Sequence, residues 1–356
     1  MGTLHEIIIG DARNLTPVNK DSIELVVTSP PYPMIEMWDD VFSALNSDIE
    51  TALKEKEGDI AFGLMHEELN RVWEEIYRVL KPGGIACINV GDATRKLKDN
   101  FQLYANHSRI LHHCLNNGFN LLPSIIWRKT TNAPNKYMGS GMLPPGAYVT
   151  LEHEHILVLR KGGKREFKDT VEKQKRYESA FFWEERNNWF ADFWNDLKGA
   201  SQALLNGETR NRSGAYPFEL AYRLINMFSI KGDTVLDPFL GTGTTTLAAM
   251  SSERSSLGFE IDSQFKPLIR NLINDDFIKF SNEYIKNRLT RHGKFVKTKE
   301  LEGKPLKYFN KPHKIPVMTG QEQYLKLNLL KSIEGDVESS YHVIYTEAPD
   351  VWPNLS

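Results

Sequence analysis

A strand, a glycine turn and a helix follow one another at residues 234–250, and this order constrains the fold more than any other feature. TVLD, residues 234–237, is a short β-branched run typical of a buried strand. Gly241 and Gly243 favour a tight turn because glycine adopts backbone conformations closed to other residues. A helix is expected from Thr244 to Met250. Such units build a sheet of parallel strands covered by helices.

The same alternation extends over most of the chain. Residues 35–60 are polar and irregular and are expected to be a helical insertion, and residues 131–148 a loop rich in Pro and Gly. The fold class is therefore α/β, with a mostly parallel central sheet. Strands are expected at 6–9, 24–28, 85–90, 124–127, 155–160, 256–260 and 342–345, and helices at 66–80, 101–117 and 218–228.

Composition narrows the class of protein. The chain has 356 residues, 40% of them hydrophobic and 25% charged, which is ordinary for a globular protein. No apolar run has the length of a membrane span, and the N-terminus lacks the basic segment of a signal peptide. Cys87 and Cys114 are too few for a disulfide framework and are expected to be small core residues. These features predict a cytoplasmic protein without a membrane partner.

The glycine turn has three candidate ligands. A dinucleotide site is disfavoured because Thr246 replaces the third glycine of G-x-G-x-x-G, and a P-loop is excluded because no lysine is present. An adenosyl ligand without a pyrophosphate, such as S-adenosyl-L-methionine (AdoMet), fits better. Glu260 follows the next strand, 19 residues after Gly241, where an acid can bind both hydroxyls of a ribose.

The stretch TSPPY, residues 28–32, follows another buried strand. Two adjacent prolines make a rigid turn, with the hydroxyl of Ser29 before it and the ring of Tyr32 after it. By itself this stretch is compatible with a plain structural turn.

Taken together, the two motifs resemble those of amino-group DNA methyltransferases. TSPPY looks like the catalytic tetrapeptide of that family, and DPFLGTGTT looks like its AdoMet-binding loop. The catalytic motif precedes the cofactor motif, which resembles the circularly permuted β-class. Supporting similarities lie in GDA (10–12), LKPGGIACINVGD (80–92), EHILVLRKG (154–162) and SGAYPFELAYRLI (213–225).

The resemblance implies an AdoMet-dependent methyltransferase fold of Rossmann type and assigns roles to residues. The catalytic set is Ser29, Pro30, Pro31 and Tyr32, and the AdoMet-binding set is Asp11, Asp237, Pro238, Phe239, Gly241, Gly243, Thr244 and Glu260. It also implies a division into a catalytic half (1–162), a target-recognition region (163–212), an AdoMet-binding half (213–285) and a C-terminal extension (286–356). No metal is expected.

An exocyclic amine of a base is a weak nucleophile because its lone pair is delocalised into the ring. Acceptors on the amino protons position the nitrogen and favour a pyramidal geometry. The carbonyl of Pro30 can accept one proton, and the Ser29 hydroxyl can accept the other or bond to a ring atom. The ring of Tyr32 provides a stacking face for a base that has left the duplex.

Family members with Ser at the first position of this motif favour the N4 amine of cytosine. The resemblance therefore implies a sequence-specific cytosine-N4 methyltransferase of a restriction-modification system, acting on double-stranded DNA with a cognate endonuclease as its functional partner. The alternatives are an N6-adenine enzyme on the same scaffold, a DNA-binding protein with an inactive site, and a nicotinamide oxidoreductase, which leaves TSPPY unexplained. A monomer and a homodimer both remain open.

Two basic stretches interrupt a chain whose net charge is −2. Residues 160–176 and 286–314 are rich in Lys and Arg, a pattern that is compatible with either a solvated surface or a polyanion-binding face. Two further features have alternative interpretations. His153 and His155 share one strand face but lack a third metal ligand in the sequence, and Asp92 either lines the cofactor pocket or caps the next turn.

Overall fold

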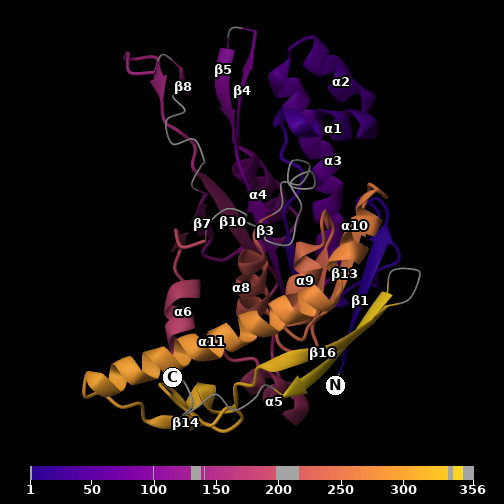
Figure 1. The fold of residues 1–356 in the computed structure, drawn as a ribbon. Helices are drawn as coiled ribbons and strands as arrows, with labels where there is room; N and C mark the ends of the chain where they lie inside the picture. The colour runs from indigo at the N-terminus through magenta and orange to yellow at the C-terminus, as the bar shows by residue number, and fades with distance from the viewer. Residues whose placement is uncertain are drawn as a thin grey trace.

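The computed structural model describes residues 2–98, 100–129, 141–197, 216–335 and 340–347, and the backbone of 138–139. Its centre is a set of five parallel strands (Figure 1), which confirms the predicted fold class. In spatial order they are β3 (Leu80–Val90), β2 (Ile23–Thr28), β12 (Thr234–Asp237), β13 (Ser255–Glu260) and β1 (Gly2–Ile9).

Further strands extend the sheet on both sides of this parallel centre. Beyond β3 lie β10 (His153–Lys161), β7 (Ile125–Arg128) and β11 (Phe193–Trp194), and β6 (Phe119–Leu121) also pairs with β10. Beyond β1 lie β17 (Ser340–Glu347) and β16 (Asn328–Gly335), so the predicted strand at 342–345 is confirmed and pairs with the N-terminal strand.

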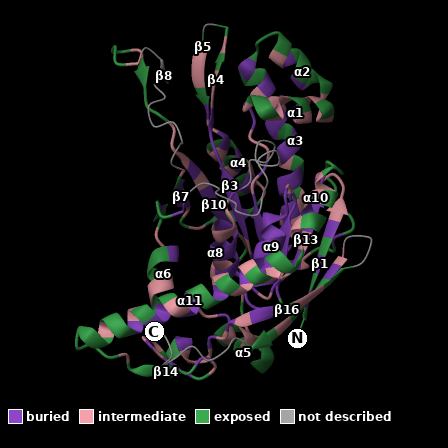
Figure 2. Cartoon of the chain, in the orientation of Figure 1, coloured by how far each residue is buried: buried purple, intermediate pink, exposed green. Residues whose placement is uncertain are grey.

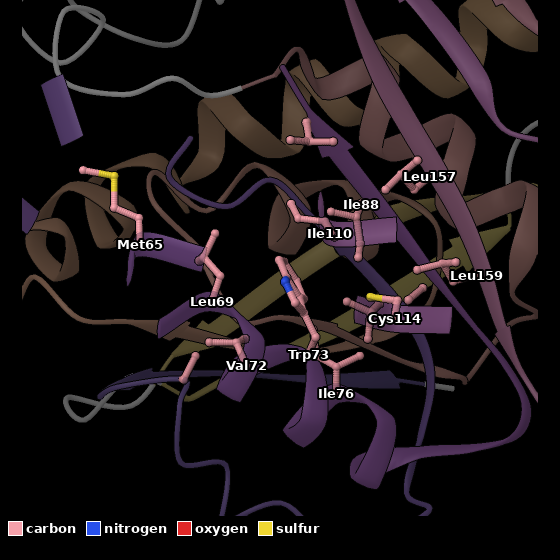
Figure 3. Packing of buried hydrophobic residues seen from close by; sticks show 14 of the residues in the cluster. Met65, Leu69, Val72, Trp73, Ile76, Ile88, Ile110, Cys114, Leu157 and Leu159 are labelled. Carbon is pink, nitrogen blue, oxygen red and sulfur yellow. The ribbon is translucent and has the colours of Figure 1, made fainter. Parts of the chain in front are cut away.

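Helices cover both faces of the sheet, because alternate residues of each strand point to opposite sides. Val26 and Ile88 face a core that is centred on Trp73 (Figure 3). Leu25 and Cys87 face the other core. The first core is closed by η1 (Glu36–Trp38), α1 (Asp39–Leu45), α2 (Ser47–Lys54), α3 (Gly58–Val79) and α4 (Asn106–Asn116), and the second by α8 (Phe218–Phe228), α9 (Thr244–Ser251) and α11 (Asp275–Leu301).

Several segments rise from the edge at which the parallel strands end. Figure 1 shows α1, α2 and two hairpins beyond this carboxyl edge, with α5 and β14 at the opposite end of the molecule. The hairpins are β4 (Ala93–Leu97) with β5 (Asn100–Tyr104), and β8 (Met138–Gly139) with β9 (Ala147–Tyr148). The remaining elements are α5 (Thr170–Glu178), α6 (Trp183–Trp189), α10 (Phe265–Leu272), η2 (Gly320–Tyr324) and the hairpin of β14 (Tyr308–Asn310) with β15 (Ile315–Val317).

The predicted helix at 101–117 is wrong in its first turn. Residues 101–104 belong to β5, whose register pairs Tyr104 with Ala93, and the helix begins at Asn106. Tyr104 suits an apolar helix face as well as it suits a strand, and its hydroxyl occupies the space that a side chain at position 58 would need. The helix at 218–228 is confirmed at both ends, and the helical insertion expected within 35–60 is confirmed as η1, α1 and α2.

The described part of the predicted target-recognition region packs against the C-terminal extension. The amide of Lys326 donates to the carbonyl of Glu178 at 3.1 Å, and the amide of Trp183 donates to Glu322 at 2.9 Å. Arg165 pairs with Asp233, directly before β12, at 2.7 Å. These contacts hold α5 and α6 near the amino edge of the central strands, away from the end of β2. Residues 198–212 lie outside the described residues.

A buried ion pair ties α6 to α11, and Figure 2 shows the mixed burial along α11. The Arg288 guanidinium, with a side chain that is 1% exposed, meets both oxygens of Glu185 at 2.7 Å and donates to the Tyr222 hydroxyl at 2.6 Å. It also lies over the ring of Trp189. Arg288 thus holds two segments together rather than facing solvent. Among the described residues, none of the helices has both the length and the apolar character needed to cross a bilayer.

We expect Arg288→Ala to lower the free energy of unfolding by about 3–5 kcal/mol, because it leaves the Glu185 carboxylate buried without its partner. Urea unfolding followed by circular dichroism measures this loss. Lys286→Ala is the matched control, since Lys286 is exposed on the same helix and its change should stay within about 0.5 kcal/mol. Equal midpoints for the two variants would contradict a structural role of the pair.

Candidate active site

The two sequence motifs meet through Asp237, at the end of β12. The hydroxyl of Thr28, the last residue of β2, donates to Oδ1 of Asp237 at 2.6 Å, and the amide of Phe239 donates to the same oxygen at 3.1 Å. The other oxygen, Oδ2, accepts from Thr245 at 2.5 Å and from the Tyr216 hydroxyl at 3.3 Å. Asp237 therefore joins the catalytic strand, the glycine turn and α9.

These four contacts make Asp237 a structural acceptor. Burial raises its pKa, and the hydrogen bonds from Thr245 and Thr28 act in the opposite direction. The sequence left open whether Asp237 orients the glycine turn or binds the methionine amine of the cofactor. Its bonds to Phe239 and Thr245 favour the first role.

The glycine turn takes the conformation that its sequence predicts. Gly241 and Gly243 have φ of 53° and 83°, in the left-handed region. A Cβ at Gly243 would lie 2.9 Å from Ile269, whereas one at Gly241 would meet nothing closer than 4.0 Å. The turn is packed on one side and open at Gly241. The hydroxyl of Thr242 is buried and has no hydrogen-bond partner within the described part of the chain.

Glu260 and Asp11 lie at neighbouring strand ends. The Glu260 carboxylate accepts from the amide of Gly241 at 2.8 Å and from that of Asp262 at 2.9 Å, and burial raises its pKa. The amide of Gly10 donates to the Glu260 carbonyl at 2.9 Å, which places Asp11 beside it. Across the carboxyl edge the order is therefore the end of β2, the glycine turn, Glu260 and Asp11.

Asp11 has a partner that the sequence did not predict. Arg13 donates to both of its oxygens through the backbone amide and the guanidinium, at 2.6–2.9 Å, and reaches Glu68 on α3 at 2.5 Å. Burial favours a higher pKa for Asp11, but the hydrogen bonds and charge of Arg13 outweigh it, and the pKa lies below its ordinary value. Asp11 is thus an ionised acceptor held by Arg13.

The hydroxyl of Tyr32, rather than its ring alone, is at the centre of a polar network. It lies 2.9 Å from Ser29 Oγ and 3.0 Å from a carboxylate oxygen of Glu154, and it accepts from Asn89 at 3.0 Å. Lys129 pairs with the other oxygen of Glu154 at 2.8 Å. Burial, followed by the charge of Glu154, raises the pKa of Tyr32. The sequence indicated a role for the ring alone and did not connect Glu154, Asn89 or Lys129 with it.

Two further groups hold the TSPPY turn in place. The amide of Asn106, fully buried at the start of α4, donates to the carbonyls of Pro33 and Gly91 at 3.1 and 3.0 Å. Gly91 leaves room for the aromatic ring, because a Cβ there would lie 2.9 Å from Tyr32. Within the described residues, no hydrogen bond ends on the carbonyl oxygen of Pro30, which leaves this acceptor available.

Asp92, His107 and His155 form a cluster that the sequence did not reveal. Their potential ligand atoms lie within 4.8 Å of one another, and His107 supplies the third member missing from the sequence. However, the rings of His107 and His155 are stacked at 3.8 Å with an angle of 17°. A metal ion lies close to the plane of each imidazole that binds it, so two parallel, stacked rings cannot share one. Nδ1 of His107 is also bonded to Asp92 at 2.7 Å.

Asp92 instead caps α4, since it accepts from the backbone amide of His107 at 3.0 Å. This favours the capping role over lining the cofactor pocket. Burial and the neighbouring His107 lower the pKa of His155 to about 4, which keeps its ring neutral near pH 7. The cysteines are core residues as predicted: both are buried, and burial raises the pKa of Cys114 to about 12.

The structure therefore brings most of the predicted residues together along one edge. Ser29 to Tyr32 end β2, the segment from Asp237 to Thr244 follows β12, and Glu260 and Asp11 end the next two strands. Pro238 and Thr244 are buried, and Phe239 packs edge-on against Trp73 at 5.9 Å. The residues that hold these groups come from distant segments, and only the strand patterns carrying Asn89 and Glu154 gave any signal for them.

Comparisons with known proteins agree with this geometry. Residues 23–271, more than half of the chain, match the model of the N6/N4 methylase family, described as DNA methylase. The Type II methyltransferase M.MthZI of Methanothermobacter thermautotrophicus is 50% identical over 348 residues, which cover 98% of this chain and 96% of that protein. M.MjaI of Methanocaldococcus jannaschii is 50% identical over 282 residues, covering 76% and 91%.

Solved structures share the fold. The DNA modification methylase TTHA0409 of Thermus thermophilus, solved with S-adenosyl-L-methionine, is 32% identical with a TM-score of 0.59, covering 77% of this chain and 93% of that chain. The cytosine-N4-specific PvuII DNA methyltransferase has a TM-score of 0.55 at 18% identity, covering 78% and 90%, and supports the fold alone. The chain thus belongs to the N6/N4 family of DNA methylases and is a site-specific Type II DNA methyltransferase that uses AdoMet.

Proposed function

We propose that the chain methylates the exocyclic N4 amine of a cytosine that has left the duplex, with Ser29, Pro30, Pro31 and Tyr32 as the catalytic segment. The observation that carries this proposal is the acceptor pair of Ser29 Oγ and the Pro30 carbonyl at the end of β2. Ser29 is neutral, so it does not repel the ring N3 acceptor of cytosine as a carboxylate would. The partly exposed ring of Tyr32 offers the stacking face.

The cofactor residues fit AdoMet. Each carboxylate offers about four acceptor positions, and the backbone amides of Gly241 and Asp262 use two of those on Glu260. The remaining positions suit the two ribose hydroxyls. The open side of Gly241 allows the backbone to approach the ligand. AdoMet supplies the methyl group when bound, and the strand order favours a ribose end at Glu260 and Asp11 and a methyl end toward Ser29.

The proposed attack requires few groups beyond these. Acceptance of two amino protons by Ser29 and Pro30 orients the nitrogen lone pair along the line of transfer. This interaction strengthens as the nitrogen becomes pyramidal, so it lowers the barrier rather than merely binding the base. A cognate restriction endonuclease as functional partner remains a prediction, as does the choice between monomer and homodimer.

The base assignment predicts the product. Genomic DNA from a host expressing the chain should contain N4-methylcytosine, and the Ser29→Ala chain should produce far less. Nucleoside analysis by mass spectrometry after complete digestion measures both, with DNA from the host carrying an empty vector as the control. N6-methyladenine in place of N4-methylcytosine would show that the same scaffold serves adenine.

We expect Glu260→Ala to weaken AdoMet binding by about 10- to 150-fold, because a charge-assisted hydrogen bond contributes roughly 1.5–3 kcal/mol. Isothermal titration calorimetry with AdoMet measures the dissociation constant. Asp262→Asn is the control, since Asp262 is an exposed acid two residues away whose side chain bonds to the amide of Gln264. An unchanged dissociation constant for Glu260→Ala would remove Glu260 from the cofactor site.

The basic stretch 286–314 is predicted to contact DNA phosphates, with the exception of Arg288, which is used inside the fold. Replacing exposed Lys294 and Lys307 by Gln should reduce the slope of log affinity against log salt by nearly 0.9 for each phosphate that is no longer neutralised. Exposed Lys20 and Lys331 give a control of equal charge. Fluorescence anisotropy with duplex DNA measures the slopes, and identical slopes would show that the stretch is only solvated surface.

A further inference from the structure

We propose that Glu154 is a positioning residue that fixes the Ser29 hydroxyl as a hydrogen-bond acceptor toward the target amine. The proposal rests on the proposed function, in which Ser29 belongs to the catalytic segment. Glu154 has no role in that function so far. It lies on β10, two strands away from Ser29 in the sheet, and acts through the hydroxyl of Tyr32.

Glu154 is a buried carboxylate with every contact on the site side accounted for by a donor. The residue is 7% exposed. Its Oε2 accepts from Asn89 at 2.6 Å and from Tyr32 at 3.0 Å, and its Oε1 accepts from the Lys129 ammonium at 2.8 Å. A buried charge is costly unless it is paired and hydrogen-bonded. Lys129 pairs with this charge, and the two remaining donors face the catalytic segment.

The network allows only one direction of hydrogen bonding at Tyr32. A phenol has one proton to donate and can accept from further donors. A carboxylate oxygen only accepts, so the Tyr32 proton goes to Glu154. The amide nitrogen of Asn89 donates to Tyr32 at 3.0 Å and to Glu154 at 2.6 Å. The reverse orientation of the Asn89 amide would place two oxygens 2.6 Å apart, and the network therefore excludes it.

The direction at Tyr32 decides the direction at Ser29. Because the Tyr32 proton is committed to Glu154, the 2.9 Å contact between the two hydroxyls requires Ser29 to donate. Ser29 has a single proton, so only its lone pairs remain for the pocket. The sequence left open whether Ser29 accepts from the amine or bonds to a ring atom. The network assigns it as an acceptor, which is the polarity that an amine with two protons needs.

A neutral amide at position 154 would reverse this order. In Glu154→Gln the oxygen is expected to face the Lys129 ammonium, which turns the NH₂ group toward Tyr32. Tyr32 then accepts from residue 154 and donates to Ser29, and the Ser29 proton points into the pocket. The change keeps size and shape but presents a donor where the target amine also presents a donor.

Single-turnover methyl transfer with enzyme in excess tests the proposal, using labelled AdoMet at saturation and unmethylated genomic DNA that the wild-type chain methylates. Glu154→Gln should slow transfer on the order of tenfold or more, with the AdoMet dissociation constant unchanged, since one hydrogen bond at the reacting amine is removed and its polarity reversed. In a Tyr32→Phe background, which also slows transfer because Ser29 is no longer oriented, Glu154→Gln should add nothing.

A double-mutant cycle separates this role from a general structural one. If Glu154 only stabilises the fold, its effect multiplies with that of Tyr32→Phe, and this result would overturn the proposal, as would a wild-type rate for Glu154→Gln. Glu152→Gln is the matched control, because Glu152 lies close by in the chain and pairs with Arg128 rather than with Tyr32. The control should transfer methyl groups at the wild-type rate.

Two further outcomes have defined meanings. If Glu154→Gln does not fold, Tyr32→Phe carries the test alone: its ring still stacks on the base, so only the loss of orientation at Ser29 slows it, and a wild-type rate overturns the proposal. If Ser29→Ala transfers at the wild-type rate, the proposed function itself fails. A slow Ser29→Ala with a wild-type Glu154→Gln would overturn the role of Glu154 alone.

Discussion

The site depends on the buried carboxylate of Asp237. It accepts the hydroxyl of Thr28 with one oxygen and that of Thr245 with the other, at 2.6 and 2.5 Å. Thr28 directly precedes Ser29, and Thr245 lies in the first turn of α9, so one side chain sets the distance between the catalytic turn and the cofactor loop. Loss of this acceptor would leave buried hydroxyls without partners and release both motifs at once. Its high burial suits a group whose task is to connect rather than to react.

The parallel sheet explains why residues far apart in the chain work together. Strands β2, β12, β13 and β1 end at the same edge, and each is followed by one of the predicted groups. Permuting the order of the motifs along the chain changes which loop connects them but not this adjacency, because β2 and β12 still pair in register at Val26 and Leu236. The C-terminal strands protect the edge of the sheet by pairing with β1, which leaves the carboxyl edge free for ligands.

Charge has different tasks in different parts of the molecule. Arg288 belongs to a basic stretch in the sequence, yet it is buried against Glu185, while Lys294 on the same helix is exposed. Lys129 offsets the charge of Glu154 beside the catalytic turn. Counting charges along the sequence cannot separate these cases, because the helix period places neighbouring basic residues on opposite faces.

The sequence alone determined the α/β class, the strand ends that carry TSPPY and the glycine turn, and the acid at 260, since each depends on local patterning and on residue types with few physical alternatives. It also identified the family, because two specific motifs occur in a defined order. Only the tertiary structure decided the partners of Tyr32, Asp237 and Asp11, the stacking of His107 on His155, and the hairpin at 93–104. Those features depend on which distant segments the sheet brings to one edge, and hydrogen-bond direction depends on every neighbour of a group at once, which no spacing along a chain encodes.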